Sequence, residues 1–181
     1  MGEFVECING MKEACEFLNF PVVSGNVSFY NETNSKSIFP TPVIGGIGLF
    51  DNLNKIINMK TKKVGNLIII VGKTFGHLGQ GSFMREIYSV NEGSPPEINL
   101  TNEKNNGQSI LNLINLNLVA SCHDVSSGGI LISLAEMSMA SMLGLKILKP
   151  KKFTDLNEYF FAEDQGRYLI EIEVDNLKKV E

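Results

Sequence analysis

Residues 67–72, LIIIVG, decide the fold class of this 181-residue chain. Five aliphatic residues in a row before a glycine are typical of a short strand that is buried on both faces. Two helical patterns follow this strand, at residues 109–118 and 126–145. We therefore expect strands and helices to intermix along the chain, as an α/β or α+β fold.

The helical pattern at residues 126–145, SSGGILISLAEMSMASMLGL, is the strongest in the chain. Ser126 or Ser127 can cap its start, and Gly144 can end it. Spacings of three and four residues predict which side chains are buried. These are Ile130, Leu131, Leu134, Met137 and Met142.

Two more strands are expected beside this helix. LVASCHDV, residues 118–125, is a short strand-like step, and YLIEIEV, residues 168–174, alternates between apolar and acidic residues with period two. The alternation places Glu171 and Glu173 on the face opposite the apolar residues. The remaining stretches predict a glycine-rich loop at 72–82, a short helix at 84–88 and a polar loop at 91–107.

Before residue 67 the pattern is poorer in regular elements. Residues 3–18 predict a helix, residues 21–30 read as a strand, and an extended segment with two prolines follows at 37–50. The polar, basic turn at 59–66 is the expected domain boundary. The elements before residue 67 are too few to bury a hydrophobic core by themselves. The apolar stripe of the helix consists of Phe4, Ile8, Met11, Cys15 and Leu18.

Composition excludes several function classes. Hydrophobic residues make up 43% of the chain and charged residues 20%, as in ordinary globular proteins. The net charge of −4 argues against a surface for nucleic acid or anionic membrane. No apolar run approaches the roughly 20 residues of a membrane span, and the N-terminus lacks the pattern of a secretory signal. Three cysteines without CxxC spacing predict buried free thiols, which favours a cytoplasmic protein.

The segment VVSGNVSFYNET, residues 22–33, is unusually polar for a strand that enters a core. Period two places Asn26 and Ser28 on one face, with Tyr30, and Gly25 on the other. An Asn carbonyl oxygen suits Mg²⁺, a Ser hydroxyl suits a phosphate or amide, and a glycine allows close approach to the backbone. Either these groups contact a ligand or they belong to a half-exposed strand that meets water.

Two glycine-containing motifs suggest anion sites. VGKT, residues 71–74, is not a P-loop, because Leu67 stands where that motif requires its first glycine. The glycine-rich loop that follows it can form a nest of N–H groups for an anion or a flexible turn. Gly128 and Gly129, in HDVSSGG, can belong to a phosphate-binding site at the start of a helix or to an ordinary N-cap.

Charged residues near the strands allow two further readings. His123 and Asp124 are neighbours in a strand and should point to opposite faces, so a structural histidine is expected. In FFAEDQGR, residues 160–167, Glu163 and Asp164 could hold a metal and Arg167 a phosphate. A polar turn before the last strand, containing Glu163, Asp164, Gln165 and Arg167, is the alternative.

Several motifs in one order resemble a known family. MGEFVECINGMKEACEFLNFPVVSGNVSFYNET, PTPVIGGIG, HDVSSGGILISLAEM and FAEDQGRYLIEI are similar to phosphoribosylformylglycinamidine synthase, the formylglycinamide ribonucleotide amidotransferase of purine biosynthesis. The resemblance implies a C-terminal part of the synthetase subunit. Residues 1–64 would be the end of a second, incomplete synthetase-like ATP-binding domain. Residues 65–181 would be most of a mixed-sheet α/β/α sandwich of the aminoimidazole-ribonucleotide-synthetase C-terminal type.

The resemblance also implies an activity. The family is an ATP-dependent ligase that forms a C–N bond, converting formylglycinamide ribonucleotide, ATP and glutamine-derived ammonia to the amidine, ADP and phosphate. Carried over onto GNVS, it assigns Gly25 to ATP, Asn26 to Mg²⁺ and Ser28 to the ribonucleotide. The family's catalytic histidine and other metal carboxylates match no residue of this chain. This chain is therefore expected to be inactive alone.

The expected partners are those of the family. They are a glutaminase subunit, a small bridging subunit and the remainder of the synthetase chain. The apolar helix stripe at residues 3–18 also predicts self-association. Two alternatives are a non-catalytic, nucleotide-binding scaffold and a kinase-like relative of the same superfamily, such as a selenophosphate or thiamine-phosphate kinase.

Overall fold

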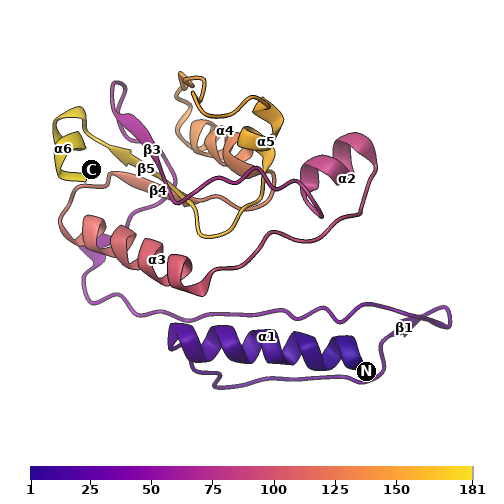
Figure 1. Cartoon of the computed structure of the whole chain (residues 1–181). Helices are drawn as coiled ribbons and strands as arrows, with labels where there is room; N and C mark the ends of the chain where they lie inside the picture. Colours follow the sequence, from indigo (N-terminus) through magenta and orange to yellow (C-terminus); the bar gives the residue numbers. More distant parts are fainter. Residues whose placement is uncertain (181) are drawn as a thin grey trace. The chain divides into compact units, whose positions relative to one another are not determined.

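A computed structural model describes residues 1–180. The chain divides into two compact units, Met1–Phe50 and the residues from Asp51 onward, which we describe one at a time (Figure 1). Among the described residues, no helix combines the length and the apolar character that a membrane crossing requires.

The first unit contains one long helix, α1 (Gly2–Leu18), as the sequence predicts. The helix ends at Asn19, whose φ of 55° is left-handed, a conformation that Asn tolerates better than most residues. The N–H of Phe20 then donates to Cys15 O at 2.9 Å and satisfies one of the last carbonyl groups of the helix. No side chain of α1 is fully buried.

The strand predicted at residues 21–30 is wrong, because this segment is irregular coil. A strand is stabilised by hydrogen bonds to a neighbour, and no described segment pairs with it. The unit instead holds a two-stranded hairpin, β1 (Glu32–Thr33) with β2 (Lys36–Ser37). Asn34 and Ser35 form its turn with φ of 51° and 59°, as a two-residue hairpin loop requires.

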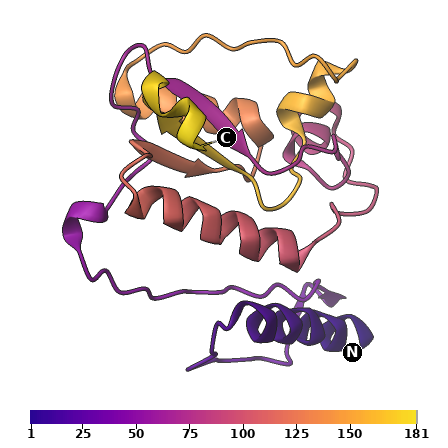
Figure 2. The ribbon, with the colours of Figure 1, turned by 60° about the vertical axis from the view of Figure 1, so that its left-hand side comes forward.

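The second unit is built on a three-stranded sheet of order β3-β5-β4. The strands are β3 (Leu67–Val71), β4 (Ser121–Asp124) and β5 (Tyr168–Ile172), close to the predicted positions. Both outer strands are antiparallel to β5, which lies between them (Figure 2). The described sheet is therefore wholly antiparallel, whereas the expected fold has a mixed sheet.

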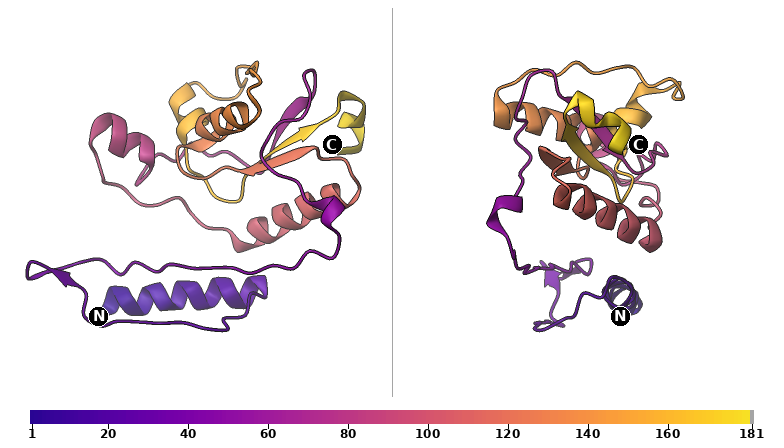
Figure 3. Two further views of the ribbon diagram at one scale, coloured as in Figure 1. Left: turned by 180° about the vertical axis from the view of Figure 1, so that it is seen from behind. Right: turned by 90° about the vertical axis from the view of Figure 1, so that its left-hand side faces the viewer.

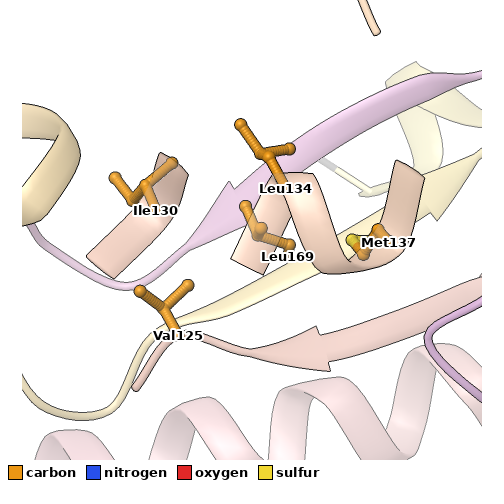
Figure 4. Close-up of a cluster of buried hydrophobic side chains, with 5 residues drawn as sticks. All are labelled: Val125, Ile130, Leu134, Met137 and Leu169. Atoms are coloured by element: carbon orange, nitrogen blue, oxygen red, sulfur yellow. The ribbon is translucent and has the colours of Figure 1, made fainter. Parts of the chain in front are cut away.

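Two helices cover opposite faces of the sheet, α3 (Leu100–Asn115) and α4 (Gly129–Ser141) (Figure 3). On the α3 side, the core contains Ile110, Val119, Ile170 and Ile172. On the α4 side, Ile130, Leu134 and Met137 pack against Leu169 and Val125 (Figure 4). The α/β/α layering is as expected.

The apolar run of β3 contributes to both cores. Ile68 and Ile70 pack on the α4 side, while Leu67, Ile69 and Val71 pack on the α3 side. This arrangement explains why the run lacks polar alternation, because each face of the strand meets a helix.

Shorter elements complete the second unit. The 3-10 helices are η1 (Leu53–Lys55) and η2 (Val174–Asn176), and the short α-helices are α2 (Ser82–Tyr88), α5 (Leu156–Phe161) and α6 (Leu177–Val180).

The start of α3 and the end of α4 differ from the predicted boundaries. α3 begins at Leu100 rather than 109, because Asn99 Oδ1 accepts the N–H of Asn102 at 2.9 Å and caps the start. α4 ends at Ser141, before Gly144, because Met142 takes a left-handed φ of 58°. Met142, predicted to be buried, is 89% exposed as a result.

Candidate functional site

The three residues predicted to bind ATP, Mg²⁺ and substrate lie in the coil between α1 and β1. Gly25, Asn26 and Ser28 are all exposed, and the space beside the Cα of Gly25 is open. The Ser28 hydroxyl accepts the N–H of Tyr30 at 3.3 Å, which turns the chain locally. Phe29 packs edge-on against Phe4 of α1, with ring centroids 5.5 Å apart. This aromatic contact packs the coil against the helix.

A second polar region lies in the other unit, at the end of the sheet where β3 and β4 terminate. β3 and β4 are both antiparallel to β5, so the carboxyl ends of β3 and β4 lie at the same end of the sheet. Three loops start or end there: the glycine-rich loop at 72–82, the segment 125–128 and the segment 162–167. The sequence alone leaves open whether these loops hold a metal, a phosphate or only one another.

Asp164 fills the glycine-rich loop. Its side chain is 3% exposed and accepts the backbone N–H groups of Phe75 at 2.8 Å, Gly76 at 3.0 Å and His77 at 3.3 Å. The nest expected for an anion is therefore present, and the anion is a carboxylate of the same chain.

Glu163 connects the starts of two helices. Its Oε1 accepts the N–H of Gly128, before α4, at 2.7 Å and the N–H of Ser82, in α2, at 2.8 Å. Burial alone would raise the pKa of Glu163, but these hydrogen bonds and the nearby Arg85 charge together hold it below its ordinary value. The predicted Ser126 or Ser127 cap is thus wrong, because this carboxylate takes that place.

Arg167 is held inside the same region. Its guanidinium is 1% exposed and donates to the carbonyl oxygens of Ala162 at 2.6 Å and Asp164 at 2.9 Å, and to Thr74 Oγ1 at 3.1 Å. Burial lowers the pKa of Arg167, and the Asp164 charge opposes this shift. Glu163, Asp164 and Arg167 therefore fasten loops to one another, which supports the polar-turn reading over a metal or phosphate site.

His123 links β4 to α4. Its Nε2 lies 2.9 Å from Glu136 Oε2 in α4, and its Nδ1 lies 3.2 Å from Asp124 Oδ1. The expectation that His123 and Asp124 point apart is wrong, because Asp124 is the last residue of the strand. The structural role expected for His123 fits its position between two elements.

The three cysteines are free thiols, and each is half-buried rather than buried as predicted. Burial and the neighbouring Asp124 carboxylate raise the pKa of Cys122 to about 11, so this thiol is protonated at neutral pH. Within residues 1–180, no group of three or more His, Cys, Asp or Glu side chains is arranged to hold a metal ion.

Sequence reasoning missed the role of Glu171. This residue is fully buried in β5, and its carboxylate accepts the N–H groups of Lys62 and Lys63, the Asn66 amide and the Ser121 hydroxyl, at 2.8–3.1 Å. It thereby fastens the turn at 61–66 to the sheet. The available signal was a single acidic residue between Ile170 and Ile172 in a strand covered on both faces.

Comparison with known proteins identifies the family. Residues 63–181 match the family model described as AIR synthase related protein, C-terminal domain. The chain belongs to this family. The layered fold of the second unit is thus an AIR synthase-related domain.

Among curated relatives of this AIR synthase-related chain, phosphoribosylformylglycinamidine synthase subunit PurL of Pelagibacter ubique is 51% identical over 178 residues. The alignment covers 98% of this chain and 24% of that protein. The predicted resemblance is confirmed, and the chain spans about a quarter of the length of the curated relatives it matches.

Solved structures show the same fold. Thermotoga maritima PurL complexed with FGAR matches with a TM-score of 0.57 and 19% identity, over 71% of this chain and 23% of that one. T. maritima PurL complexed with ATP matches with a TM-score of 0.52 and 18% identity, over 71% and 20%. At these identities the likeness concerns the fold alone.

Proposed function

We propose that this chain is part of a PurL-type synthetase of purine biosynthesis, an ATP-dependent ligase. The reaction would convert formylglycinamide ribonucleotide, ATP and ammonia to formylglycinamidine ribonucleotide, ADP and phosphate. The observation that carries the proposal is the 51% identity with a PurL subunit over nearly the whole chain. Solved PurL structures of the same fold are complexed with FGAR and with ATP, which supports the choice of ligands.

In this proposal the coil at residues 22–33 is the chain's contribution to the active site. Gly25 would contact ATP, Asn26 would ligate Mg²⁺ through its carbonyl oxygen, and Ser28 would hold the ribonucleotide. Two features support this assignment: these residues are exposed, and Gly25 leaves room beside the backbone. The carboxylates of Glu163 and Asp164 are, by contrast, already engaged by backbone N–H groups.

A single amide oxygen does not make a magnesium site, so the remaining ligands would come from the rest of the synthetase. We propose that residues 1–64 end its second ATP-binding domain and that 65–181 form the following domain. The start of the family match at residue 63 supports this boundary. A glutaminase subunit and a small bridging subunit would deliver ammonia, in the cytoplasm.

The test is a chimera in which this chain replaces the matching quarter of the P. ubique PurL subunit. ADP release is measured with formylglycinamide ribonucleotide, ATP, Mg²⁺ and ammonium, which makes a glutaminase unnecessary. We expect turnover by the chimera and none by this chain alone. Asn26→Ala in the chimera should lower the rate of ADP release by about 100-fold or more, because a metal ligand is removed.

Asn105→Ala is the matched control, because Asn105 is an exposed asparagine in α3 of the other unit. It should leave turnover unchanged. Full activity of Asn26→Ala would reject the metal role and favour the scaffold alternative. Turnover by this chain alone would show that the catalytic groups lie among residues that we consider structural.

A further inference from the structure

The coil that carries the proposed ligand contacts is attached to α1 at two points. At the start of the coil, Phe20 donates its N–H to Cys15 O at 2.9 Å. Near its end, the Phe29 ring meets the Phe4 ring at an interplanar angle of 61°. The coil therefore runs back beside the helix, from the C-terminal end of α1 to its first turn (Figure 1).

These two attachments leave slack in the chain between them. The segment from Phe20 to Phe29 could span about 30 Å when fully extended. The stretch of α1 beside it, from Phe4 to Cys15, is only about 17 Å long, from the rise per residue of an α-helix. A neighbouring strand would hold such a segment along its whole length, but no described strand pairs with it. Where the middle of the coil lies therefore depends on its second attachment.

Phe29 is the attachment nearest to the proposed ligand contacts. It directly follows Ser28, whose hydroxyl accepts the N–H of Tyr30 at 3.3 Å, and the chain bends at Phe29. Side chains of neighbouring residues in an extended segment point to opposite sides. The Phe29 ring is turned to α1, so Ser28 and Asn26 lie on the side away from the helix, and both are exposed.

The contact between the two rings can be removed without damage to a core. Phe29 remains 72% exposed, and Phe4 is half-buried. Neither ring belongs to the two buried clusters of the sheet domain. Loss of the contact should therefore change where the coil lies rather than whether the chain folds.

We propose that Phe29 is a positioning residue, whose contact with Phe4 holds the coil so that Asn26 and Ser28 meet their ligands together. The inference rests on the proposed function, in which Asn26 ligates Mg²⁺ and Ser28 holds the ribonucleotide. A coil without this attachment occupies the binding position only part of the time. The affinity for the ribonucleotide then falls by that fraction, while the bound complex reacts as before. The effect belongs to KM rather than to kcat.

Steady-state kinetics of the P. ubique chimera test the proposal, with formylglycinamide ribonucleotide varied at saturating ATP, Mg²⁺ and ammonium. We expect Phe29→Ala to raise KM for the ribonucleotide by about tenfold and to leave kcat within about twofold. Phe4→Ala should do the same, and the double variant no more than either alone, because both changes remove one contact. Phe29→Leu keeps an apolar side chain against Phe4 and should restore most of the affinity.

Phe39→Ala is the matched control, because it removes a phenylalanine ring that is 79% exposed elsewhere in the same unit. It should change neither KM nor kcat. A second measurement uses this chain alone and does not depend on turnover. Backbone ¹⁵N relaxation of Asn26 and Ser28 should show greater picosecond-to-nanosecond mobility with Phe29→Ala and no change with Phe39→Ala.

The outcomes separate this inference from the proposed function. An inactive chimera, or one that is indifferent to Asn26→Ala, rejects the proposed function or its metal assignment, and this inference with it. A chimera that responds to Asn26→Ala but keeps its KM with Phe29→Ala rejects the positioning role alone. Effects of Phe29→Ala and Phe4→Ala that add in the double variant also reject it, as does unchanged mobility of the coil. Should Phe29→Ala lower the urea midpoint of this chain, Phe29→Leu decides, because a positioning role requires it to restore KM.

Discussion

Glu171 shows how one buried charge can organise a domain. Its carboxylate has no exposure to water, yet each of its oxygens accepts hydrogen bonds from the turn at 61–66 or from Ser121. A buried carboxylate is tolerated only when donors surround it. The donors here come from the segment that enters the sheet domain and from β4, so Glu171 joins three parts of the chain.

Glu171→Gln tests this role. The amide presents N–H donors to groups that are themselves donors, so we expect the free energy of unfolding to fall by about 2–4 kcal/mol. Urea denaturation measures the change. Glu173→Gln is the control two residues along, because Glu173 is exposed and its ion pair with Lys63 spans 4.0 Å. Its effect should stay within about 0.5 kcal/mol, and equal effects of both changes would contradict our account.

At the scale of elements, Glu163 sets how α2 and α4 start. A helix start carries unpaired N–H groups and a partial positive charge, and a carboxylate satisfies both. Because one oxygen of Glu163 serves Ser82 and Gly128 together, the two starts are held side by side. A phosphate that approached either start would meet this negative charge.

The lowered pKa of Glu163 makes this connection sensitive to pH. The folded chain favours the ionised form more than the unfolded chain does, so the stabilisation is complete above the ordinary value of 4.5 and is lost as pH falls through the lower folded-state pKa. We expect Glu163→Gln to be less stable than the unmodified chain at pH 7. The gap should narrow at a pH below 4.5, as urea denaturation at both pH values would show.

Glu97→Gln, in an exposed part of the loop before α3, is the control for charge removal. It should match the unmodified chain at both pH values within about 0.5 kcal/mol. A gap for Glu163→Gln that did not change with pH would mean that the side chain acts through packing rather than charge.

Elements with strong periodic patterns were predictable from sequence. The apolar run of β3, the alternation of β5 and the stripe of α4 each reflect burial against a neighbour that the chain itself supplies. The start of α3 was not predictable, because residues 101–109, TNEKNNGQS, follow Leu100 without any apolar side chain and give no helical periodicity. The strand at 21–30 was mispredicted because periodicity reports a preference, whereas a strand also needs a partner.

The candidate site was predictable only in part. Polar residue types at Gly25, Asn26 and Ser28 pointed to a ligand, but the structure leaves them in exposed coil and does not assemble a pocket. The carboxylates of FAEDQ were equally suggestive, and only their distances to backbone N–H groups showed that they are internal partners. Residue type alone cannot distinguish a carboxylate that binds a ligand from one that binds its own backbone.

At the scale of the whole molecule, the two units differ in how well they bury apolar surface. The second unit has a core on each face of its sheet, whereas no residue of Met1–Phe50 is fully buried. Val23, Val43 and Ile47 are each about 90% exposed. Apolar surface of this extent marks an interaction site or a liability to associate.

We expect this chain to self-associate through the α1 stripe defined by Phe4, Ile8, Met11, Cys15 and Leu18. Ile8→Glu should raise the concentration at which association begins by about tenfold, since burying a charge in an apolar contact costs more than 1.4 kcal/mol. Light scattering over a concentration series measures the effect. Asn9→Glu adds the same charge on another face of α1 and should have little influence. A monodisperse monomer at all concentrations would contradict the prediction.

The place of β5 in the sheet has a consequence for synthesis on the ribosome. Among the described strands, β3 and β4 each pair with β5, and β5 is translated after both. At about 5–20 residues per second, β3 waits on the order of ten seconds for its partner. During that time its five aliphatic residues are available to chaperones, and neighbouring nascent chains on one messenger could compete for them. The arrangement makes completion of this sheet wait until β5 has been translated.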